Sequence, residues 1–328
     1  MPLHVLVTGA YGNVGRHVLR ELVRRGHRVR AFDVPSPTAR RDAAQLPGAE
    51  PFWGDLRAKA DVLRAVEGID AVAHLAFVLP PRTESDPKGT YAINVQGSLN
   101  LFEALKAQRP SARVALASSY SLYGDTRDLE GLVTAQTPVS LVSQYNRHKA
   151  EVEERLRASG LGWTILRLGV VLSGESALRT KLDPTLIFDL PADCKQEFVH
   201  NDDVATAFAR CFEVEEAWGK VLLIGGGPSG QLRYLDFMNR TLGALGIAPL
   251  PAEAFSRDAL QGGGWMDTSE SQRLLGYQSW TFERHLEDLA KRAGIRRTLA
   301  QVFSPLLRAW LVRASRHTRK NRQAETRA

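Results

Sequence analysis

Residues 4–33 read HVLVTGAYGNVGRHVLRELVRRGHRVRAFD. The apolar run at 4–10 predicts a strand, the spacing of apolar residues across 15–26 predicts a helix, and 27–33 predicts a second strand. Strand, helix and strand in this order form a right-handed βαβ unit, whose two strands lie parallel in one sheet.

The same alternation continues through the first half of the chain. Further elements are expected in this order: helix 60–68, strand 69–77, helix 94–108, strand 112–119, helix 143–157 and strand 163–171. Such alternation is typical of an α/β fold, in which helices cover both faces of a doubly wound parallel sheet. The second half is less regular. Helices are expected at 201–214 and 268–276, and the latter begins with Ser269 and Gln272 at the spacing of a capping box.

The chain has 328 residues, of which 44% are hydrophobic and 24% charged, the composition of an ordinary globular protein. Its first residues pass directly into an apolar run, and no stretch of eighteen apolar residues occurs, so we expect a cytoplasmic chain. Cys194 and Cys211 have neither metal-ligand nor disulfide-framework spacing and are expected to pack in the core, and no metal site is expected.

The net charge of +7 arises at one end of the chain. Residues 291–328 hold eleven Lys and Arg and one acidic residue, Glu325, whereas the remainder carries a net charge of −3. Any argument for nucleic-acid or membrane binding must therefore rest on this tail.

Gly9, Gly12 and Gly15 lie between the first predicted strand and helix, in TGAYGNVG at 8–15. At such a turn one glycine permits the tight bend, one lets the backbone approach a pyrophosphate, and one allows close packing of helix and strand. The first amides of the helix face the bound anion. Because Asp33 ends the second strand, where a carboxylate accepts hydrogen bonds from ribose hydroxyls, the pattern predicts a dinucleotide site.

Asp33 favours NAD(H) over NADP(H), because its carboxylate repels a 2′-phosphate. Arg40 and Arg41 could accept that phosphate, but they follow PSPT and are expected to be solvated loop charges. Asp55 is expected either to face the adenine or to cap the helix that follows.

Tyr145 precedes Lys149 by four residues, and roughly 0.2 such pairs are expected by chance in a chain of this composition. Tyr145, Lys149, Val152 and Leu156 share one face of a helix, which places Lys149 on the apolar side. A merely solvated lysine would be expected on the opposite face. The placement of Lys149 therefore indicates a function beside a dinucleotide.

Eight motifs resemble the extended short-chain dehydrogenase/reductases, also called the NAD-dependent epimerase/dehydratase family, over about residues 3–290. In order they are TGAYGNVG, GDL, HLAF, NVQGSLNLFEA, SSYSLYG, YNRHK, FVHNDDVA and MDTSESQRLLG. The resemblance implies an NAD-dependent enzyme with a Rossmann-type fold and a smaller C-terminal α/β substrate-binding region. We expect a cofactor domain at 1–174 with 198–227 packed back on it, a substrate region formed by 175–197 and 228–298, and a basic amphipathic tail at 299–328.

The resemblance makes Tyr145 the general acid/base, Lys149 the residue that binds the nicotinamide ribose, and Ser119 the third catalytic residue, with Ser118 and Ser121 as less favoured serines. It places a larger set of residues at the cofactor: Gly9, Gly12, Asn13, Val14, Gly15, Asp33, Asp55, Leu56, Leu75, Ala76, Tyr145 and Lys149.

Three further positions are compared with the family pattern. Asn94 matches the family's helical Asn, for which the resemblance implies a structural or proton-relay role. Phe77 stands where a small residue is usual, and Leu168 where proline is common after Arg167. Both departures lie near the expected cofactor and substrate, so they bear on the substrate rather than on the fold.

A phenol with its ordinary pKa of about 10 is a poor base near neutral pH. The Lys149 ammonium one helical turn away and a cationic nicotinamide are together expected to lower the pKa of Tyr145. The Ser119 hydroxyl would then orient the substrate oxygen, so that proton transfer accompanies hydride transfer.

The segment 175–196 bears on the substrate. Family members that act on nucleotide-linked sugars have a long segment here, whereas this one is short and has few basic residues: Arg179, Lys181 and, at its end, Lys195. We therefore expect a small or lipophilic secondary alcohol or ketone. Two alternatives are a nucleotide-sugar epimerase or dehydratase that oxidises its substrate transiently with tightly bound NAD, and a non-catalytic dinucleotide-sensing protein. His200 is expected to cap a helix or lie in the core rather than face the cleft.

The tail carries an apolar stripe at helical spacing over 299–314: Leu299, Val302, Phe303, Leu306, Leu307, Trp310, Leu311 and Ala314. Ser304 and Pro305 are expected to cause a kink or to begin a second helix. We expect the stripe to dock on the protein's own body or on the partner in a homodimer. The alternative is an amphipathic anchor, with its apolar face in lipid and five cations near anionic headgroups: Arg308, Arg313, Arg316, Arg319 and Lys320. Nucleic-acid binding is not expected, because no aromatic platform accompanies the charge.

Overall fold

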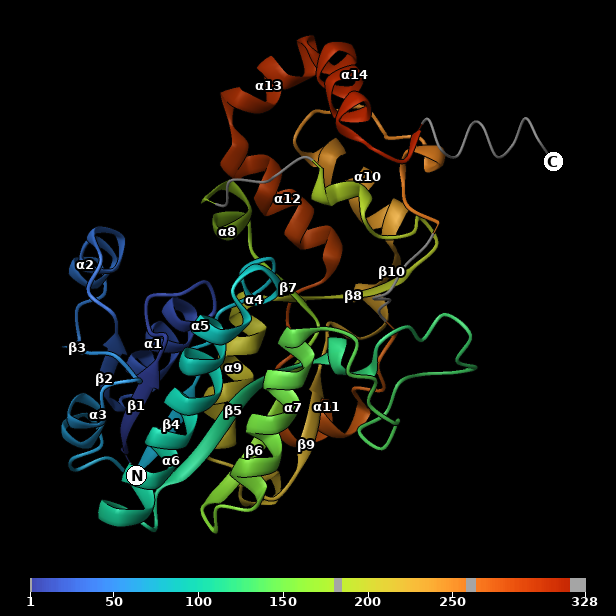
Figure 1. Cartoon of the computed structure of the whole chain (residues 1–328). Helices are drawn as coiled ribbons and strands as arrows, with labels where there is room; N and C mark the ends of the chain where they lie inside the picture. The colour runs from blue at the N-terminus through green and yellow to red at the C-terminus, as the bar shows by residue number, and fades with distance from the viewer. Residues whose placement is uncertain (1, 180–184, 258–263, 319–328) are drawn as a thin grey trace.

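The computed structural model describes residues 2–179, 185–257 and 264–318. Its main sheet has seven parallel strands in the order β3-β2-β1-β4-β5-β6-β9 (Figure 1). The strands are β1 His4–Thr8, β2 Arg28–Asp33, β3 Ala49–Trp53, β4 Ala71–His74, β5 Arg113–Ser119, β6 Gly162–Leu168 and β9 Val221–Ile224. The direction of travel from strand to strand reverses between β1 and β4, the position at which doubly wound sheets bind ligands.

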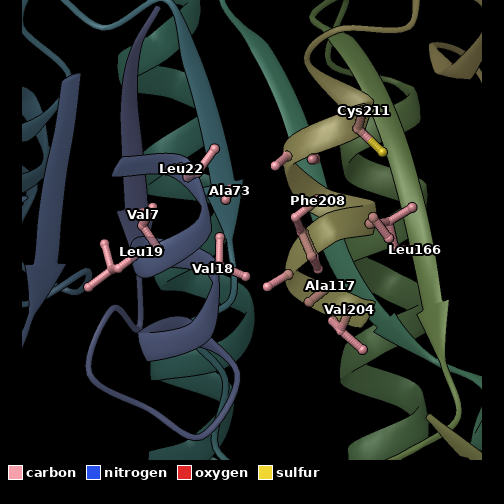
Figure 2. Packing of buried hydrophobic residues seen from close by; sticks show 14 of the residues in the cluster. Val7, Val18, Leu19, Leu22, Ala73, Ala117, Leu166, Val204, Phe208 and Cys211 are labelled. Atoms are coloured by element: carbon pink, nitrogen blue, oxygen red, sulfur yellow. The ribbon is translucent and has the colours of Figure 1, made fainter. Parts of the chain in front are cut away.

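Helices cover both faces of this sheet. One face packs against α1 Gly15–Arg24, α9 Asn201–Cys211 and α11 Ser269–Leu275, through a core that includes Val18, Phe208 and Leu275. Figure 2 shows the part of this core that α1 and α9 share with the strands between them. The opposite face packs against α3 Lys59–Ala65, α6 Gly97–Gln108 and α7 Gln144–Arg157. The predicted α/β, Rossmann-type architecture is confirmed.

A second, three-stranded sheet has the order β10-β8-β7, formed by Gln231–Arg233, Lys195–His200 and Val170–Leu172. The prediction of one continuous strand over 163–171 was wrong, because the chain leaves the main sheet at Gly169. Gly169 donates its amide to Ile224 O at 2.9 Å, and a Cβ there would lie 2.6 Å from Glu197 O. Only a glycine allows the backbone to cross between the sheets this closely.

The smaller sheet is covered by α10 Tyr234–Ala244 and α12 Phe282–Ala293, and α12 also packs against α8 Gly174–Arg179. At the centre of this separate core, the ring of Phe282 stacks on Phe237 and meets Phe198 edge to face. Further helices are α2 Pro37–Ala44, α4 Arg82–Ser85, α5 Pro87–Tyr91, α13 Ile295–Val302 and α14 Ser304–Ala314, together with a π-helical turn at Ala92–Gln96 and short 3₁₀ helices at Tyr120–Tyr123, Leu186–Phe188, Glu215–Ala217, Gly227–Gly230 and Ala252–Ala254.

Helix caps were predicted with mixed success. The capping pair expected at Ser269 and Gln272 does not form: the residue before α11 is Thr268, and its side chain makes no capping bond. Gln272 Oε1 instead accepts from the amide of Tyr277 at 3.1 Å, beyond the other end of the helix. At α7, the helix that carries Tyr145, Ser143 Oγ accepts from Asn146 N at 3.1 Å and fixes where the helix begins.

The tail forms two helices, and α14 has Pro305 in its first turn, as expected. The predicted docking of the apolar stripe on the protein's own body is only partly correct. Leu311 is buried in the core of the smaller sheet, whereas Leu306 and Trp310 on the same helix are exposed. Among the described helices, none is long and apolar enough to span a membrane.

Candidate active site

A cavity of about 570 Å³ lies along the carboxyl ends of the main strands, at the point where the strand order reverses. Every residue predicted for the catalytic or cofactor site lines it: Gly9, Gly12, Asn13, Val14, Gly15, Asp33, Asp55, Leu56, Leu75, Ala76, Ser119, Tyr145 and Lys149. These residues come from five strand ends and from α7. The fold therefore brings together segments that are up to 140 residues apart in the sequence.

The three glycines of the loop after β1 have different surroundings. Gly9 has φ +65°, and a Cβ there would lie 2.8 Å from Ala76 N in the neighbouring loop. A Cβ on Gly15 would overlap the carbonyl oxygen of Gly9. Gly12 has an ordinary φ and is exposed on the cavity wall. A Cβ there would have one close neighbour, Gly9 O at 3.2 Å. Gly9 and Gly15 thus serve the turn and its packing, whereas Gly12 leaves the cavity side open.

These surroundings give two opposite expectations for alanine. Gly9→Ala should lower the free energy of unfolding by at least about 2 kcal/mol, because the left-handed backbone and the contact with Ala76 are both unfavourable. Gly12→Ala should leave the melting temperature nearly unchanged and weaken dinucleotide binding instead. Thermal denaturation and cofactor titration of the two variants check this, and equal destabilisation of both would contradict the assignment.

A buried relay of hydrogen bonds joins the glycine loop to the loop after β4. Ala76 N donates to Thr8 Oγ1 at 3.3 Å, and Thr8 Oγ1 lies 2.7 Å from His74 Nδ1. His74 Nε2 lies 2.8 Å from Ser98 Oγ, which donates to Asn94 O. Burial lowers the pKa of His74 to about 3, so the ring is neutral and has one donor and one acceptor nitrogen. Every hydrogen-bond donor in the relay therefore faces one acceptor. The sequence analysis missed Thr8, His74 and Ser98 as positioning residues. Each is a polar residue within an otherwise apolar segment, and this pattern could have indicated a buried hydrogen-bond partner.

Asn94 fixes the same loop from the side of the π-helical turn. Its Oδ1 accepts from Val78 N at 2.7 Å, and its Nδ2 donates to Val78 O at 3.0 Å. This reciprocal pair satisfies both backbone groups of a residue that lines the cavity. Of the two roles expected for Asn94, these contacts favour the structural one.

Asp33 lies at the end of β2 beside the glycine loop. Its carboxylate accepts from Tyr11 N at 2.9 Å and from Val34 N at 2.8 Å, which leaves further acceptor positions toward the cavity. Burial raises the pKa of Asp33, and the two amides oppose that shift. Asp55 does not cap α3: it pairs with Arg57, whose hydrogen bonds lower the pKa of the Asp55 carboxyl.

Arg40 and Arg41 are exposed, as expected, but they lie on helix α2 rather than in a loop. Ser36 caps this helix and Pro37 begins it, a start signal that the sequence analysis did not use. The Arg40 guanidinium lies 5.1 Å from the centre of the Trp53 ring. Neither arginine is among the described residues that line the cavity.

The structure separates the three candidate serines. Ser118 also lines the cavity, but its Oγ is engaged in donating to the buried carboxylate of Glu153 at 2.6 Å. Ser121 bonds to Asn146 at 3.3 Å and is not among the described lining residues. Ser119 lines the cavity at the end of β5 and shares a hydrogen bond with Tyr145.

Lys149 is 3% exposed and lies on the apolar side of α7, where Val152 and Leu156 are also buried, as predicted. Its ammonium donates to Ala117 O at 2.6 Å and lies 3.6 Å from the centre of the Phe77 ring. Burial lowers the pKa of Lys149 to about 7, and the negative charge of Glu153 opposes this shift. The lysine is therefore a desolvated cation with few partners.

Of the two causes expected to lower the pKa of Tyr145, the Lys149 ammonium does not do so in this structure. Burial raises the pKa of Tyr145 to about 12, and the hydrogen bond with Ser119 opposes the rise only in part. The ammonium of Lys149 lies 5.9 Å from the centre of the Tyr145 ring and bonds to Ala117 O instead. Spacing along the helix placed the two residues on one face, but it did not account for the loss of solvent around the phenol.

A buried ionic network lies behind Lys149. Arg167 binds Glu153 through two bonds, Nη2 to Oε2 at 2.7 Å and Nε to Oε1 at 3.0 Å, and donates from Nη1 to Tyr123 OH at 2.7 Å. The network ties α7 to β5 and β6, and so fixes the face that presents Tyr145 and Lys149. The sequence analysis missed Glu153, although it stands four residues after Lys149 on the same face.

Residues outside the cavity bear on two other expectations. His200 precedes α9 as its cap, with Nδ1 accepting from Asp202 N at 3.2 Å, and its ring stacks on Trp280 at 3.7 Å, so the capping and core role is confirmed. Lys181 lies outside the described residues, and Arg179 ends α8, with nothing described of its side chain.

Comparison with known proteins identifies the family. The model of the NAD dependent epimerase/dehydratase family matches residues 5–225. UDP-glucose 4-epimerase of Lactobacillus helveticus is 32% identical over 181 residues, which are 53% of this chain and 53% of that protein. The 2-alkyl-3-oxoalkanoate reductase of Stenotrophomonas maltophilia is 28% identical over 275 residues, 77% of this chain and 79% of that protein.

Among solved structures, the UDP-glucose 4-epimerase of Thermus thermophilus in complex with NAD superposes with a TM-score of 0.74, covering 89% of this chain and 99% of that one at 24% identity. That likeness concerns the fold. The chain spans about half the length of the first curated relatives that it matches. Since the family model matches well over half of the chain, the protein belongs to the NAD-dependent epimerase/dehydratase family, whose members are extended short-chain dehydrogenase/reductases.

Proposed function

We propose that this protein is an NAD(H)-dependent oxidoreductase that interconverts a secondary alcohol and a ketone on a small or lipophilic substrate. The observation that carries the proposal is that Ser119, Tyr145 and Lys149 line the same cavity as the glycine loop and Asp33. Three residues able to bind an oxygen and move a proton therefore face the place where a dinucleotide would lie.

The residues present fit such a cofactor. The exposed Gly12 leaves room for a pyrophosphate at the amides that begin α1, and Asp33 retains acceptor positions for ribose hydroxyls. The Lys149 ammonium, with Ala117 O as its one described hydrogen-bond partner, can donate to the second ribose. When bound, the nicotinamide would accept or supply the hydride.

The chain's own residues would handle the proton and the substrate oxygen. In ketone reduction the Tyr145 hydroxyl gives its proton to the carbonyl oxygen as that oxygen becomes a hydroxyl. A raised pKa keeps Tyr145 protonated, as a donor must be, and the Ser119 hydroxyl holds the oxygen in line. In the reverse direction the same phenol must lose its proton, which the Lys149 cation favours.

The described cavity lining favours an apolar substrate. Beyond the predicted site residues, its described lining has one polar side chain, Ser118, and is otherwise apolar or glycine: Phe32, Val34, Phe77, Val78, Leu79, Ile93, Ala117, Leu168, Gly169 and Val171. Lys149 is the one cationic side chain in this described lining, and it is committed to the catalytic pair. The amides that begin α1 would serve the pyrophosphate of the dinucleotide, so the second diphosphate of a nucleotide sugar would find no further cation in this described lining. The name of the 2-alkyl-3-oxoalkanoate reductase, which matches 77% of this chain, describes a ketone that carries alkyl groups and a carboxylate.

Net turnover tests the proposal. Purified protein given NADH and a panel of aliphatic and cyclic ketones should consume NADH in proportion to the alcohol formed. A nucleotide-sugar epimerase would retain NAD and show no net redox change, and a dinucleotide-sensing protein would bind NADH without turnover.

Cofactor choice gives a separate prediction. Because the Asp33 carboxylate would lie against a 2′-phosphate, we expect NADH to be preferred over NADPH by at least about tenfold in kcat/KM. Asp33→Ser should reduce the preference for NADH, mainly by raising the KM for NADH, because the ribose hydroxyls lose a hydrogen-bond acceptor. Steady-state kinetics with both cofactors checks this, and an unchanged ratio would show that Asp33 does not face the ribose.

A further inference from the structure

We propose that α13 and α14 form a docking surface for an anionic lipid bilayer, so that the enzyme binds a membrane peripherally. We call this surface the tail face. It consists of six apolar residues: Ile295, Leu299, Val302, Phe303, Leu306 and Trp310. Each of these residues is more than half exposed, with Val302 at 70% and Leu306 at 69%. The proposal concerns binding and does not rest on the proposed reaction.

The tail face is continuous along two helices. On α13 its members lie at i, i+4 and i+7, which places them on one side of the helix. On α14, Leu306 and Trp310 lie one turn apart, and Val302 and Phe303 are consecutive at the junction between the helices. Figure 1 shows both helices at the end of the molecule that is farthest from the main sheet. The surface is therefore accessible to a large, flat partner.

The opposite side of the two helices is already bound to the protein. Leu311 is buried, Arg308 Nε donates to Pro249 O at 2.7 Å, and Ser304 Oγ accepts from Ala248 N at 2.7 Å. Ser315 Oγ also donates to Ala254 O. These contacts fix which side of α14 faces outward. On α13, the backbone at Arg297 lies against Gly246, where a Cβ would be 2.5 Å from Arg297 O. Folding of the chain onto itself thus uses one side and leaves the apolar tail face exposed, a patch of the kind that marks an interaction site.

The charge of this segment favours an anionic bilayer over a second copy of the chain. From Leu289 to Ala324 the sequence contains no acidic residue, whereas residues 291–318 contain seven Lys and Arg. Two tail faces packed together would bring these cations close to one another. Arg296 and Arg313 are exposed, and neither forms an ion pair with a described acid. Exposed apolar and aromatic residues flanked by Arg are the composition of helices that lie in a lipid interface.

Flotation of the full-length protein with vesicles tests the proposal. Binding is expected to phosphatidylcholine vesicles that contain about 30% phosphatidylglycerol, and to fall at least about tenfold with phosphatidylcholine alone or at about 0.5 M salt. Val302→Asp with Leu306→Asp should reduce binding to anionic vesicles by at least about tenfold. Arg296→Ala with Arg313→Ala should also weaken it, by about tenfold, with little change in melting temperature.

A matched control uses two other exposed apolar residues, Leu132 and Val139, each 44% exposed in the loop before α7. Leu132→Asp with Val139→Asp should bind vesicles like the unchanged protein. Truncation at Thr298 is not a suitable test, because it removes the buried Leu311 from the core. Arg319 and Lys320, two of the cations expected near headgroups, lie outside the described residues, and the full-length protein retains them in every arm of the experiment.

Three results would overturn the proposal: no flotation with anionic vesicles, equal flotation with neutral vesicles, or flotation that the Val302 and Leu306 changes leave intact. Absence of flotation together with a dimer that these two changes dissociate, measured by light scattering, would assign the tail face to a second copy of the chain.

Discussion

Tyr145→Phe is expected to lower kcat for ketone reduction by about 10²- to 10⁴-fold, the usual loss when a general acid is removed. The phenyl ring keeps the edge-to-face contact with Phe77, whose ring centre lies 5.7 Å away, and the helix cap at Ser143 is unaffected. The melting temperature and the Kd for NADH should therefore change little. The loss should appear in kcat and in kcat/KM alike, because the hydroxyl acts in the transition state.

A matched control is Tyr91→Phe. The Tyr91 hydroxyl donates to Glu151 at 3.0 Å on the far side of α7 and does not line the cavity among the described residues. Its loss should leave turnover within about twofold of the unchanged enzyme. A comparable loss of kcat in both variants would mean that turnover is sensitive to any hydroxyl packed at α7. The assignment of Tyr145 as the general acid would then fail.

Lys149→Met is expected to abolish measurable turnover and to make the protein more stable. The ordinary lysine pKa of 10.5 falls to about 7 in the fold, so ionised Lys149 opposes folding by roughly 5 kcal/mol below pH 7. The variant also loses the bond to Ala117 O, which costs about 1–2 kcal/mol. A net gain of about 3 kcal/mol, or roughly 4 °C in melting temperature, is expected at pH 6.

The gain in stability of Lys149→Met should decrease as the pH rises. Between the folded pKa of about 7 and the unfolded pKa of about 10.5, the unfolded chain binds more protons than the folded one, so the unchanged protein becomes more stable as the pH rises. The advantage of Lys149→Met should therefore be largest below pH 7 and shrink steadily up to about pH 10. Denaturant unfolding at several pH values measures it. A variant that is less stable at pH 6 would show that the buried ammonium is well paired.

Much of the fold could be predicted because its constraints are local. The βαβ alternation and the spacing of Gly9, Gly12 and Gly15 depend on neighbours along the chain, and so does the face that Tyr145 shares with Lys149. The break between β6 and β7 could not be predicted in this way. It depends on the approach of Glu197, 28 residues after Gly169, which no pattern around the glycine reveals.

The supporting residues of the site were missed for the same reason. Thr8 meets His74, and Glu153 meets Arg167, only once the strands are paired and α7 is packed against them. The direction of the Tyr145 pKa was also beyond the sequence, because it depends on how much solvent the surrounding loops exclude. Patterns thus identified which residues face the cavity, whereas packing decided their protonation and support.

Net NADH oxidation by the purified enzyme, followed at 340 nm with a panel of apolar ketones, tests the proposed reaction most directly. The structure predicts stoichiometric conversion of NADH and ketone to NAD⁺ and alcohol, exchange of the cofactor with solution, and loss of both products in Tyr145→Phe. Purified protein that retains one NAD per chain and interconverts a nucleotide sugar without net consumption of NADH would contradict it.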